Sequence, residues 1–152
     1  MRKTFLFSIT FLICSALLVG CQSDNTKPDY NYISPEELKV RLDRGDITNG
    51  RMMMFTTQTE KEYASGYLED AIPTYARPLE TDADFSKLDP VLNQVRVTSE
   101  DIIIICPRGG SGATRPFDYF EENGIHPDRM LILTGGQEAY NRAFPDDVVV
   151  AN

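Results

Sequence analysis

The chain has 152 residues, with 15 lysines and arginines against 23 aspartates and glutamates, so its formal net charge is −8 at pH 7. This length is enough for one domain with a proper hydrophobic core. A chain this acidic disfavours nucleic acid and anionic lipid as partners, and an anionic substrate would need a locally positive pocket.

The N-terminus has the pattern of a secretory signal. Arg2 and Lys3 precede an apolar run from residue 5 to about residue 19, which is too short to span a bilayer stably. The run ends in LLVGC, residues 17–21, which resembles a bacterial lipobox, where the peptide is cut before a cysteine that is then lipidated. An ordinary signal peptide, or an uncleaved anchor with Cys21 incidental, is the alternative.

We therefore expect a signal peptide over residues 1–20, a lipidated Cys21 with a polar tether over residues 21–29, and one domain over residues 30–152. Cleavage would leave 152 − 20 = 132 residues, with 13 basic and 23 acidic side chains and a net charge of −10. The expected location is the cell envelope, with the acyl chains in the bilayer and the domain monomeric. Gln22 after the cysteine is compatible with outer-membrane sorting where the source has such a membrane.

The cysteines set Cys106 apart. Cys14 would leave with the signal peptide and Cys21 would carry the lipid, so one thiol remains. In an envelope protein, a leftover cysteine suggests a reactive thiol or an intermolecular bridge. Because His126 is the sole histidine, the sequence predicts no Cys/His metal cluster and no cofactor, although a site made only of carboxylates stays open.

Helix caps and apolar runs divide the domain into alternating helices and strands. Ser34 with Glu37, and Thr59 with Glu62, have the spacing of capping boxes. In chain order we expect a helix over 34–45, a buried strand over 51–57, a helix over 59–66 and a brief strand within 70–75. A helix around 88–95, a buried strand over 101–106, a helix over 115–124 and a strand over 130–134 should follow. The segment 135–144 should form a Gly-Gly turn at residues 135–136 and then a short closing helix.

This alternation predicts a small parallel α/β sheet of about five strands with helices on both faces. In such sheets, ligands bind beyond the carboxyl ends of the strands. Cys106 ends DIIIIC, the most apolar run of the chain. Its expected position is therefore that of a site residue.

The segment that follows, PRGGSGATR, has the composition of an anion-binding loop. Glycines can take positive φ at little cost, which allows several backbone N–H groups to turn inward around a negative atom. A helix N-terminus beside cationic groups favours a thiolate, and Pro116 requires the next helix to begin close to residues 112–116. We predict Cys106 as the catalytic thiol and the following as its anion-binding residues: Arg108, Gly109, Gly110, Ser111, Gly112 and Arg115, with Thr114 as a further hydroxyl donor.

Two other interpretations of the loop stay open at this point. Cysteine is among the most often buried residues, so Cys106 could be an inert core side chain. A nucleotide-binding loop is the second alternative, but no GK[ST] follows the glycines.

The chain from about residue 30 to residue 144 resembles a single rhodanese-like domain. Four segments carry the resemblance: ISPEELKVRLDRGD, TEKEYASGYLEDAIP, IIIICPRGGSGATR and LILTGGQEAYNRAF. The resemblance implies a parallel α/β fold with Cys106 at the base of a backbone nest. It also implies that Cys106 takes a sulfane sulfur from a small anionic donor such as thiosulfate, holds it as a persulfide, and passes it to a thiol acceptor.

Several positions depart from the family pattern. Many active members carry Asp-Val-Arg where this chain has FTTQ, residues 55–58, and a histidine where it has Tyr67. The loop is about one residue longer than a typical sulfurtransferase loop and lacks the usual arginine five residues after the cysteine. Longer loops occur in related phosphatases and arsenate reductases, which use an arginine six residues after the cysteine. That position is Gly112 here.

Three functions follow from these observations. The leading hypothesis is an envelope sulfurtransferase or persulfide carrier that uses Cys106. A rhodanese-like binding module without catalysis is the second, and a cysteine-dependent phosphatase or arsenate reductase is the third.

Overall fold

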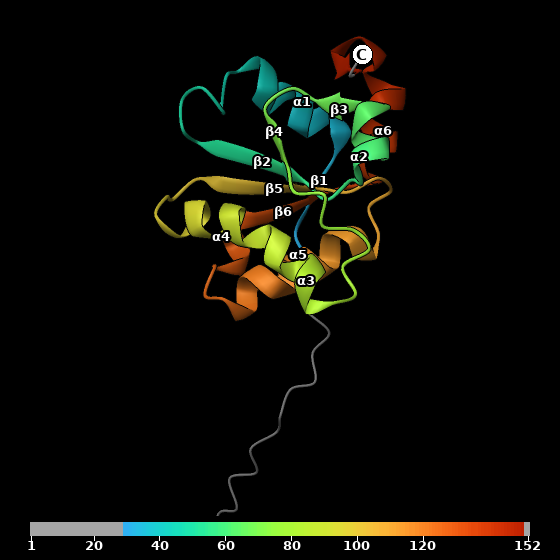
Figure 1. Ribbon diagram of the computed structural model, residues 1–152. Helices are drawn as coiled ribbons and strands as arrows, with labels where there is room; N and C mark the ends of the chain where they lie inside the picture. Colours follow the sequence, from blue (N-terminus) through green and yellow to red (C-terminus); the bar gives the residue numbers. More distant parts are fainter. Residues whose placement is uncertain (1–28, 151–152) are drawn as a thin grey trace, which may run out of the picture.

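The computed structural model describes residues 29–150, and the expected signal peptide and Cys21 lie outside this range. Its centre is a five-stranded, all-parallel sheet in the order β1-β6-β5-β2-β4 (Figure 1). The strands are β1 (Tyr32–Ile33), β2 (Met52–Thr56), β4 (Ala71–Pro73), β5 (Asp101–Ile105) and β6 (Met130–Leu133). The predicted fold class is confirmed.

Helices cover both faces of this sheet. The α-helices are α1 (Pro35–Asp43), α2 (Glu60–Ala64), α3 (Asp82–Phe85), α4 (Asp89–Arg96), α5 (Ser111–Glu122) and α6 (Gly136–Ala143). Short 3₁₀ helices occupy Ser86–Leu88, Pro127–Arg129 and Pro145–Asp147, and a small antiparallel pair joins β3 (Tyr67–Leu68) to β7 (Val148–Val149). In Figure 1, α1, α2 and α6 lie on one side of the sheet, and α3, α4 and α5 lie on the other.

Both predicted capping boxes are present. The Glu37 N–H donates to Ser34 Oγ at 3.1 Å, and the Ser34 N–H donates to Glu37 Oε2 at 3.0 Å, which fixes the start of α1. Thr59 and Glu62 make the same reciprocal bonds at α2. A third box starts α3, a helix that we did not predict.

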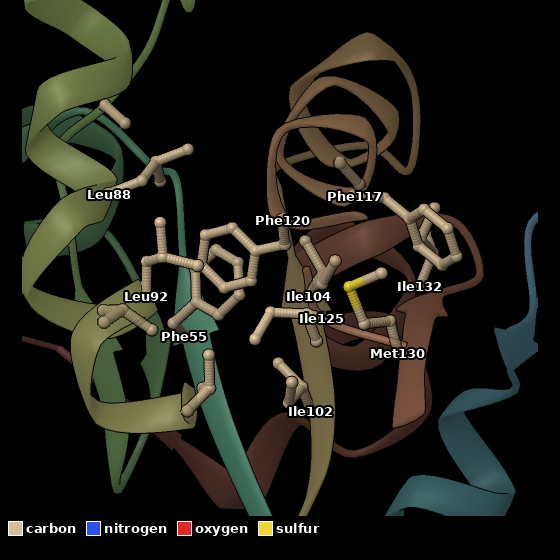
Figure 2. Packing of buried hydrophobic residues seen from close by; sticks show 14 of the residues in the cluster. Phe55, Leu88, Leu92, Ile102, Ile104, Phe117, Phe120, Ile125, Met130 and Ile132 are labelled. Atoms are coloured by element: carbon tan, nitrogen blue, oxygen red, sulfur yellow. The ribbon is translucent and has the colours of Figure 1, made fainter. Parts of the chain in front are cut away.

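The central strand β5 separates two hydrophobic layers. Ile102 and Ile104 pack on the side of α4 and α5, whereas Ile103 and Ile105 pack on the side of α1 and α6. Figure 2 shows the first layer, in which the rings of Phe55 and Phe120 stack with centroids 5.2 Å apart. Because both faces are covered, β5 is apolar without alternation, and Cys106 emerges from its carboxyl end at the middle of the sheet.

Helix α5 begins earlier than its sequence indicates. It starts at Ser111, so Pro116 lies inside the helix. We had expected Pro116 in the first turn. A proline has no N–H for the carbonyl four residues before it, which here is that of Gly112. The Thr57 hydroxyl donates to that carbonyl at 2.8 Å, so a side chain from the end of β2 replaces the missing helical bond.

Within residues 29–150, no helix is long and apolar enough to cross a membrane.

Candidate active site

Cys106 is buried at the carboxyl end of β5, with 2% of its surface exposed. Its Sγ accepts a hydrogen bond from the Gly109 N–H at 3.0 Å. The thiol therefore faces back toward the loop that follows it, as an anion-binding loop requires. A backbone N–H at this distance stabilises negative charge on sulfur.

The loop owes its shape to close backbone contacts. Gly109 has a φ of +75°, and a Cβ there would lie 2.7 Å from the Gly135 nitrogen. Gly136 has a φ of +62°, and a Cβ there would lie 2.1 Å from the Cys106 carbonyl oxygen. Neither position accommodates a side chain, so the loops after β5 and β6 pack backbone to backbone.

The first turn of α6 holds the cysteine loop in place. The Gln137 N–H donates to the Cys106 carbonyl at 2.8 Å, and the Glu138 N–H donates to the Pro107 carbonyl at 3.0 Å. These N–H groups have no partner within their own helix, so the loop carbonyls satisfy them.

Of the three loop glycines that we predicted as anion-binding residues, only Gly109 has a positive φ. Gly110 has a φ of −97°, and Gly112 is an ordinary helical residue in the first turn of α5. Gly112 has a different role, because a Cβ there would lie 3.2 Å from the Cys106 Cβ and 3.7 Å from Sγ. Its lack of a side chain lets the helix approach the thiol.

A pocket of about 270 Å³ opens beside Cys106. Six of its lining residues were predicted: Cys106, Arg108, Gly110, Ser111, Gly112 and Arg115. Gly109 contributes its N–H to Sγ, whereas Thr114 does not line the pocket. The remaining wall consists of Arg77, Pro78, Glu80 and Pro107.

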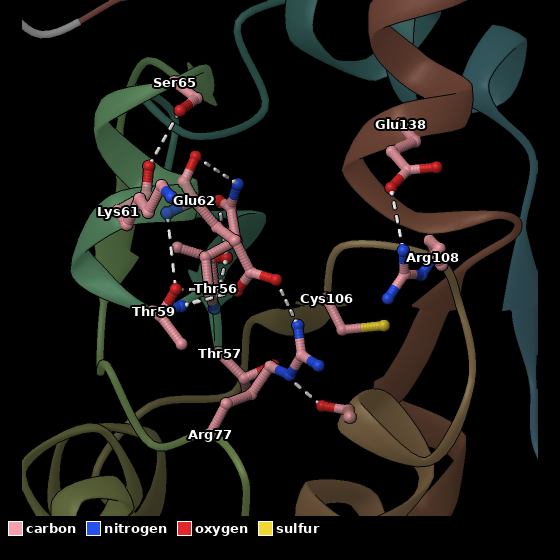
Figure 3. Close-up of polar contacts among 12 residues, drawn as sticks. Thr56, Thr57, Thr59, Lys61, Glu62, Ser65, Arg77, Cys106, Arg108 and Glu138 are labelled. Atoms are coloured by element: carbon pink, nitrogen blue, oxygen red, sulfur yellow. Dashed lines mark hydrogen bonds and ion pairs between the residues drawn. The ribbon is translucent and has the colours of Figure 1, made fainter.

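Three arginines line the pocket, and each is held by an acidic side chain or a backbone carbonyl. Arg77 forms an ion pair with Glu62, and Arg108 lies 3.6 Å from the Glu138 carboxylate. Figure 3 shows Cys106 between these two arginines. Arg115 donates to the Leu79 carbonyl at 3.0 Å, so it also holds the loop that carries Arg77.

Glu62 is a fixed anion on the far side of Arg77. Burial raises the pKa of its carboxyl, but hydrogen bonds from the N–H and hydroxyl of Thr59 and the charge of Arg77 outweigh burial and lower this pKa below its ordinary value. The carboxylate therefore stays ionised and orients the Arg77 guanidinium at the pocket.

Two of these contributors had no predicted role in the site. Arg77 was left without a role because nothing beside it in the sequence connects it with Cys106. The backbone brings it there through positive φ values at Tyr75 and Leu79. Thr57 stands within the segment that departs from the family pattern, and its hydroxyl supports the start of α5 by donating to the Gly112 carbonyl.

The pocket suits an anion more than a metal. Its chemistry is a thiol, backbone N–H groups and guanidinium groups, which donate hydrogen bonds and carry positive charge. Among residues 29–150, no group of three histidine, cysteine, aspartate or glutamate side chains lies close enough to hold a metal ion.

No known family model matches the sequence, and no curated protein matches it. Solved structures do match. An As-Sb reductase from Leishmania major has a TM-score of 0.63 at 18% identity, over 80% of this chain and 86% of that one. A yeast protein tyrosine phosphatase of the rhodanese family has a TM-score of 0.62 at 14% identity, over 84% of this chain and 96% of that one.

A thiosulfate sulfurtransferase from Pseudomonas aeruginosa has a TM-score of 0.53 at 18% identity, over 82% of this chain but only 20% of that longer one. At such identities the likeness shows the fold. The fold is rhodanese-like, as the sequence resemblance implied.

Proposed function

We propose that this rhodanese-like domain is a sulfurtransferase or persulfide carrier that acts through Cys106. One observation carries the proposal: Sγ accepts the Gly109 N–H at 3.0 Å beside a pocket lined by three arginines. A buried inert cysteine would need neither the donor nor the cations. Thiosulfate is a small dianion that such a pocket would attract.

The donor step needs only a thiolate. The Cys106 thiolate attacks the outer sulfur of thiosulfate, a bond forms between Sγ and that sulfur, and the sulfur–sulfur bond of thiosulfate breaks. Sulfite leaves with the electron pair, so a thiolate and a dianion become a persulfide anion and a dianion. The arginines would orient thiosulfate and stabilise the departing charge.

The acceptor step reverses the roles. An incoming thiolate attacks the terminal sulfur of the Cys106 persulfide, and the bond between that sulfur and Sγ breaks. The electron pair returns to Sγ, which is then a thiolate held by the Gly109 N–H. No external oxidant or reductant takes part, and no side-chain base is needed on the nucleophile.

Intact mass after incubation with thiosulfate tests the proposal. The domain should gain one sulfur atom, a subsequent thiol should remove it, and Cys106→Ser should abolish the gain. If excess thiosulfate or a small persulfide leaves the mass unchanged, catalysis is refuted. Thiosulfate binding to Cys106→Ser without sulfur gain in the wild type would then identify the second candidate, a binding module.

A phosphatase or arsenate reductase is the competing enzyme, since one structural neighbour is described as a protein tyrosine phosphatase and another as an As-Sb reductase. Gly112 argues against it, because the position six residues after the thiol has no guanidinium. Hydrolysis of p-nitrophenyl phosphate that is lost in Cys106→Ser would overturn our ranking, and absence of turnover supports it.

We also propose that the domain is monomeric and anchored at the cell envelope through acylated Cys21, on the sequence pattern alone. Expressed from its full sequence in a bacterium, the protein should partition into detergent, and Cys21→Ala should not. A water-soluble wild type would contradict the anchor.

A further inference from the structure

A second pocket adjoins the first. It has a volume of about 470 Å³ and lies between α2 and α6, where its lining includes Lys61, Gln137, Glu138 and Asn141. Pro107 lines both pockets, and the ion pair between Arg108 and Glu138 joins a residue of each. A ligand in the second pocket would therefore stand beside the sulfur site.

The carbonyl oxygen of Gln137 lacks a hydrogen-bond partner. The residue is 2% exposed, and its Nε2 donates to Asn141 Oδ1 at 2.7 Å. Its Oε1 is the buried side-chain polar atom without a partner within residues 29–150. Leaving such an acceptor unpaired is costly, and because Gln137 lines the second pocket, a hydrogen-bond donor bound there would offset that cost.

Glu138 supplies a second acceptor in the same turn of α6. Its carboxylate is 51% exposed and lies 3.6 Å from Arg108, beyond hydrogen-bond distance. The neighbouring Gln58 amide is already used, because it donates to the Gly66 carbonyl at 2.9 Å. The Gln137 carbonyl and the Glu138 carboxylate can therefore both accept hydrogen bonds from a ligand. The exposed Lys61 also lines the pocket, and its positive charge would repel a cation.

We propose that this pocket binds the primary ammonium group of the thiol that accepts sulfur from Cys106, so that the acceptor is an aminothiol. An ammonium group has three N–H donors and a positive charge, which match Gln137 Oε1 and the Glu138 carboxylate. This inference rests on the proposed function. The transfer follows the acceptor step above, in which the thiolate takes the terminal sulfur and Sγ receives the electron pair.

Two acceptors of equal size test it. The wild type is loaded with thiosulfate, freed of donor, and treated with cysteamine or with 2-mercaptoethanol at equal thiolate concentration. Loss of the added sulfur is followed by intact mass. We expect cysteamine to react about tenfold faster, as for one charge-assisted hydrogen bond. The readout is the ratio of the two rates. A change in the loop that alters the reactivity of the persulfide affects both rates equally, so the ratio stays the same.

Matched variants locate the effect. Gln137→Met and Glu138→Gln should each bring the ratio close to one, and Lys61→Gln should raise it. Glu121→Gln removes an exposed carboxylate of α5 outside both pockets and should leave the ratio unchanged. Equal rates in the wild type, or a preference that persists in both Gln137→Met and Glu138→Gln, would overturn the inference.

A binding measurement separates this inference from the proposed function. Propylammonium chloride, titrated into the unloaded domain, should shift the Gln137 side-chain amide resonances, and sodium chloride should not. Absence of that shift refutes the ammonium site even if sulfur loads. A shift without sulfur loading supports the site and refutes sulfur transfer alone.

Discussion

The molecule contains two groups of three arginines that differ in what they surround. In one, Arg41, Arg44 and Arg51 converge on the Asp46 carboxylate at 3.0, 2.6 and 2.9 Å. That carboxylate is fully buried by its neighbours. Hydrogen bonds and charge from the arginines, above all from Arg44, outweigh burial and hold its pKa well below the ordinary range.

In the other group, the arginines do not converge on a carboxylate. Arg77 and Arg108 have acidic partners that line the second pocket, and Arg115 binds backbone carbonyls. Glu80 is the one carboxylate among the lining residues of the Cys106 pocket. The Asp46 group has its anion within the chain, whereas the arginines of the Cys106 pocket are those that we propose to bind an anionic sulfur donor.

The largest test of this contrast is Asp46→Asn. The change leaves three guanidinium groups around a neutral amide, so we expect a clear fall in the midpoint of thermal unfolding with sulfur loading retained below it. Asp43→Asn, which removes an exposed carboxylate of the same region, should change the midpoint far less. Loss of loading in the folded Asp46→Asn variant would break the contrast.

The second test is the double variant Arg77→Gln/Arg115→Gln. At limiting thiosulfate, sulfur loading should slow by about 100-fold, since two charge-assisted contacts to the anion are lost. Arg96→Gln/Arg142→Gln changes the net charge equally outside the pocket and should slow loading little. Equal slowing in both would mean that net charge, and not the pocket, attracts the donor.

Acid should weaken the contribution of the Asp46 group to stability. Because the folded-state pKa of Asp46 is lowered from 3.8, its contribution to stability is fully present well above pH 3.8 and is lost as the pH falls from there toward the folded-state value. The free energy of unfolding should therefore decrease with acid more steeply in the wild type than in Asp46→Asn. Denaturant titrations between about pH 6 and pH 3 measure this, and parallel curves would contradict it.

The smallest expected effect concerns the hydrogen bond from Thr57 to the Gly112 carbonyl, which supports the helix beside the Cys106 pocket. Thr57→Val removes the donor to the Gly112 carbonyl and should destabilise the domain by about 1–2 kcal/mol. Pro116→Ala restores a helical N–H for that carbonyl, so Thr57→Val should cost less in that background. A double-mutant cycle in urea measures the difference, and equal costs in both backgrounds would refute the link.

The sequence predicted the parts of the fold that local rules determine. Capping boxes at Ser34 and Thr59 located α1 and α2, and four consecutive isoleucines located the central strand. Strands of two residues, such as β1 and β7, were missed because their pairing depends on partners far along the chain. Helix α3 lies in a stretch too polar and too short for an apolar period to show.

In the site too, features encoded by a local segment were predicted, and features that depend on distant segments were not. Cys106 and its loop were predicted because a contiguous segment encodes them. Arg77 and Thr57 reach the loop from the segments after β4 and β2, so only the folded sheet brings them there. Gly136 belonged to a predicted turn, but its contact with the Cys106 carbonyl depends on how β5 and β6 align.

That contact also governs how the site could move. The loop after β5 is tied to α6 by two backbone hydrogen bonds and by a glycine contact too tight for any side chain. To swing the thiol outward, the protein would have to unwind the start of α6. In the proposed sulfur transfer, a large acceptor would therefore have to extend its own thiol as far as the buried Sγ.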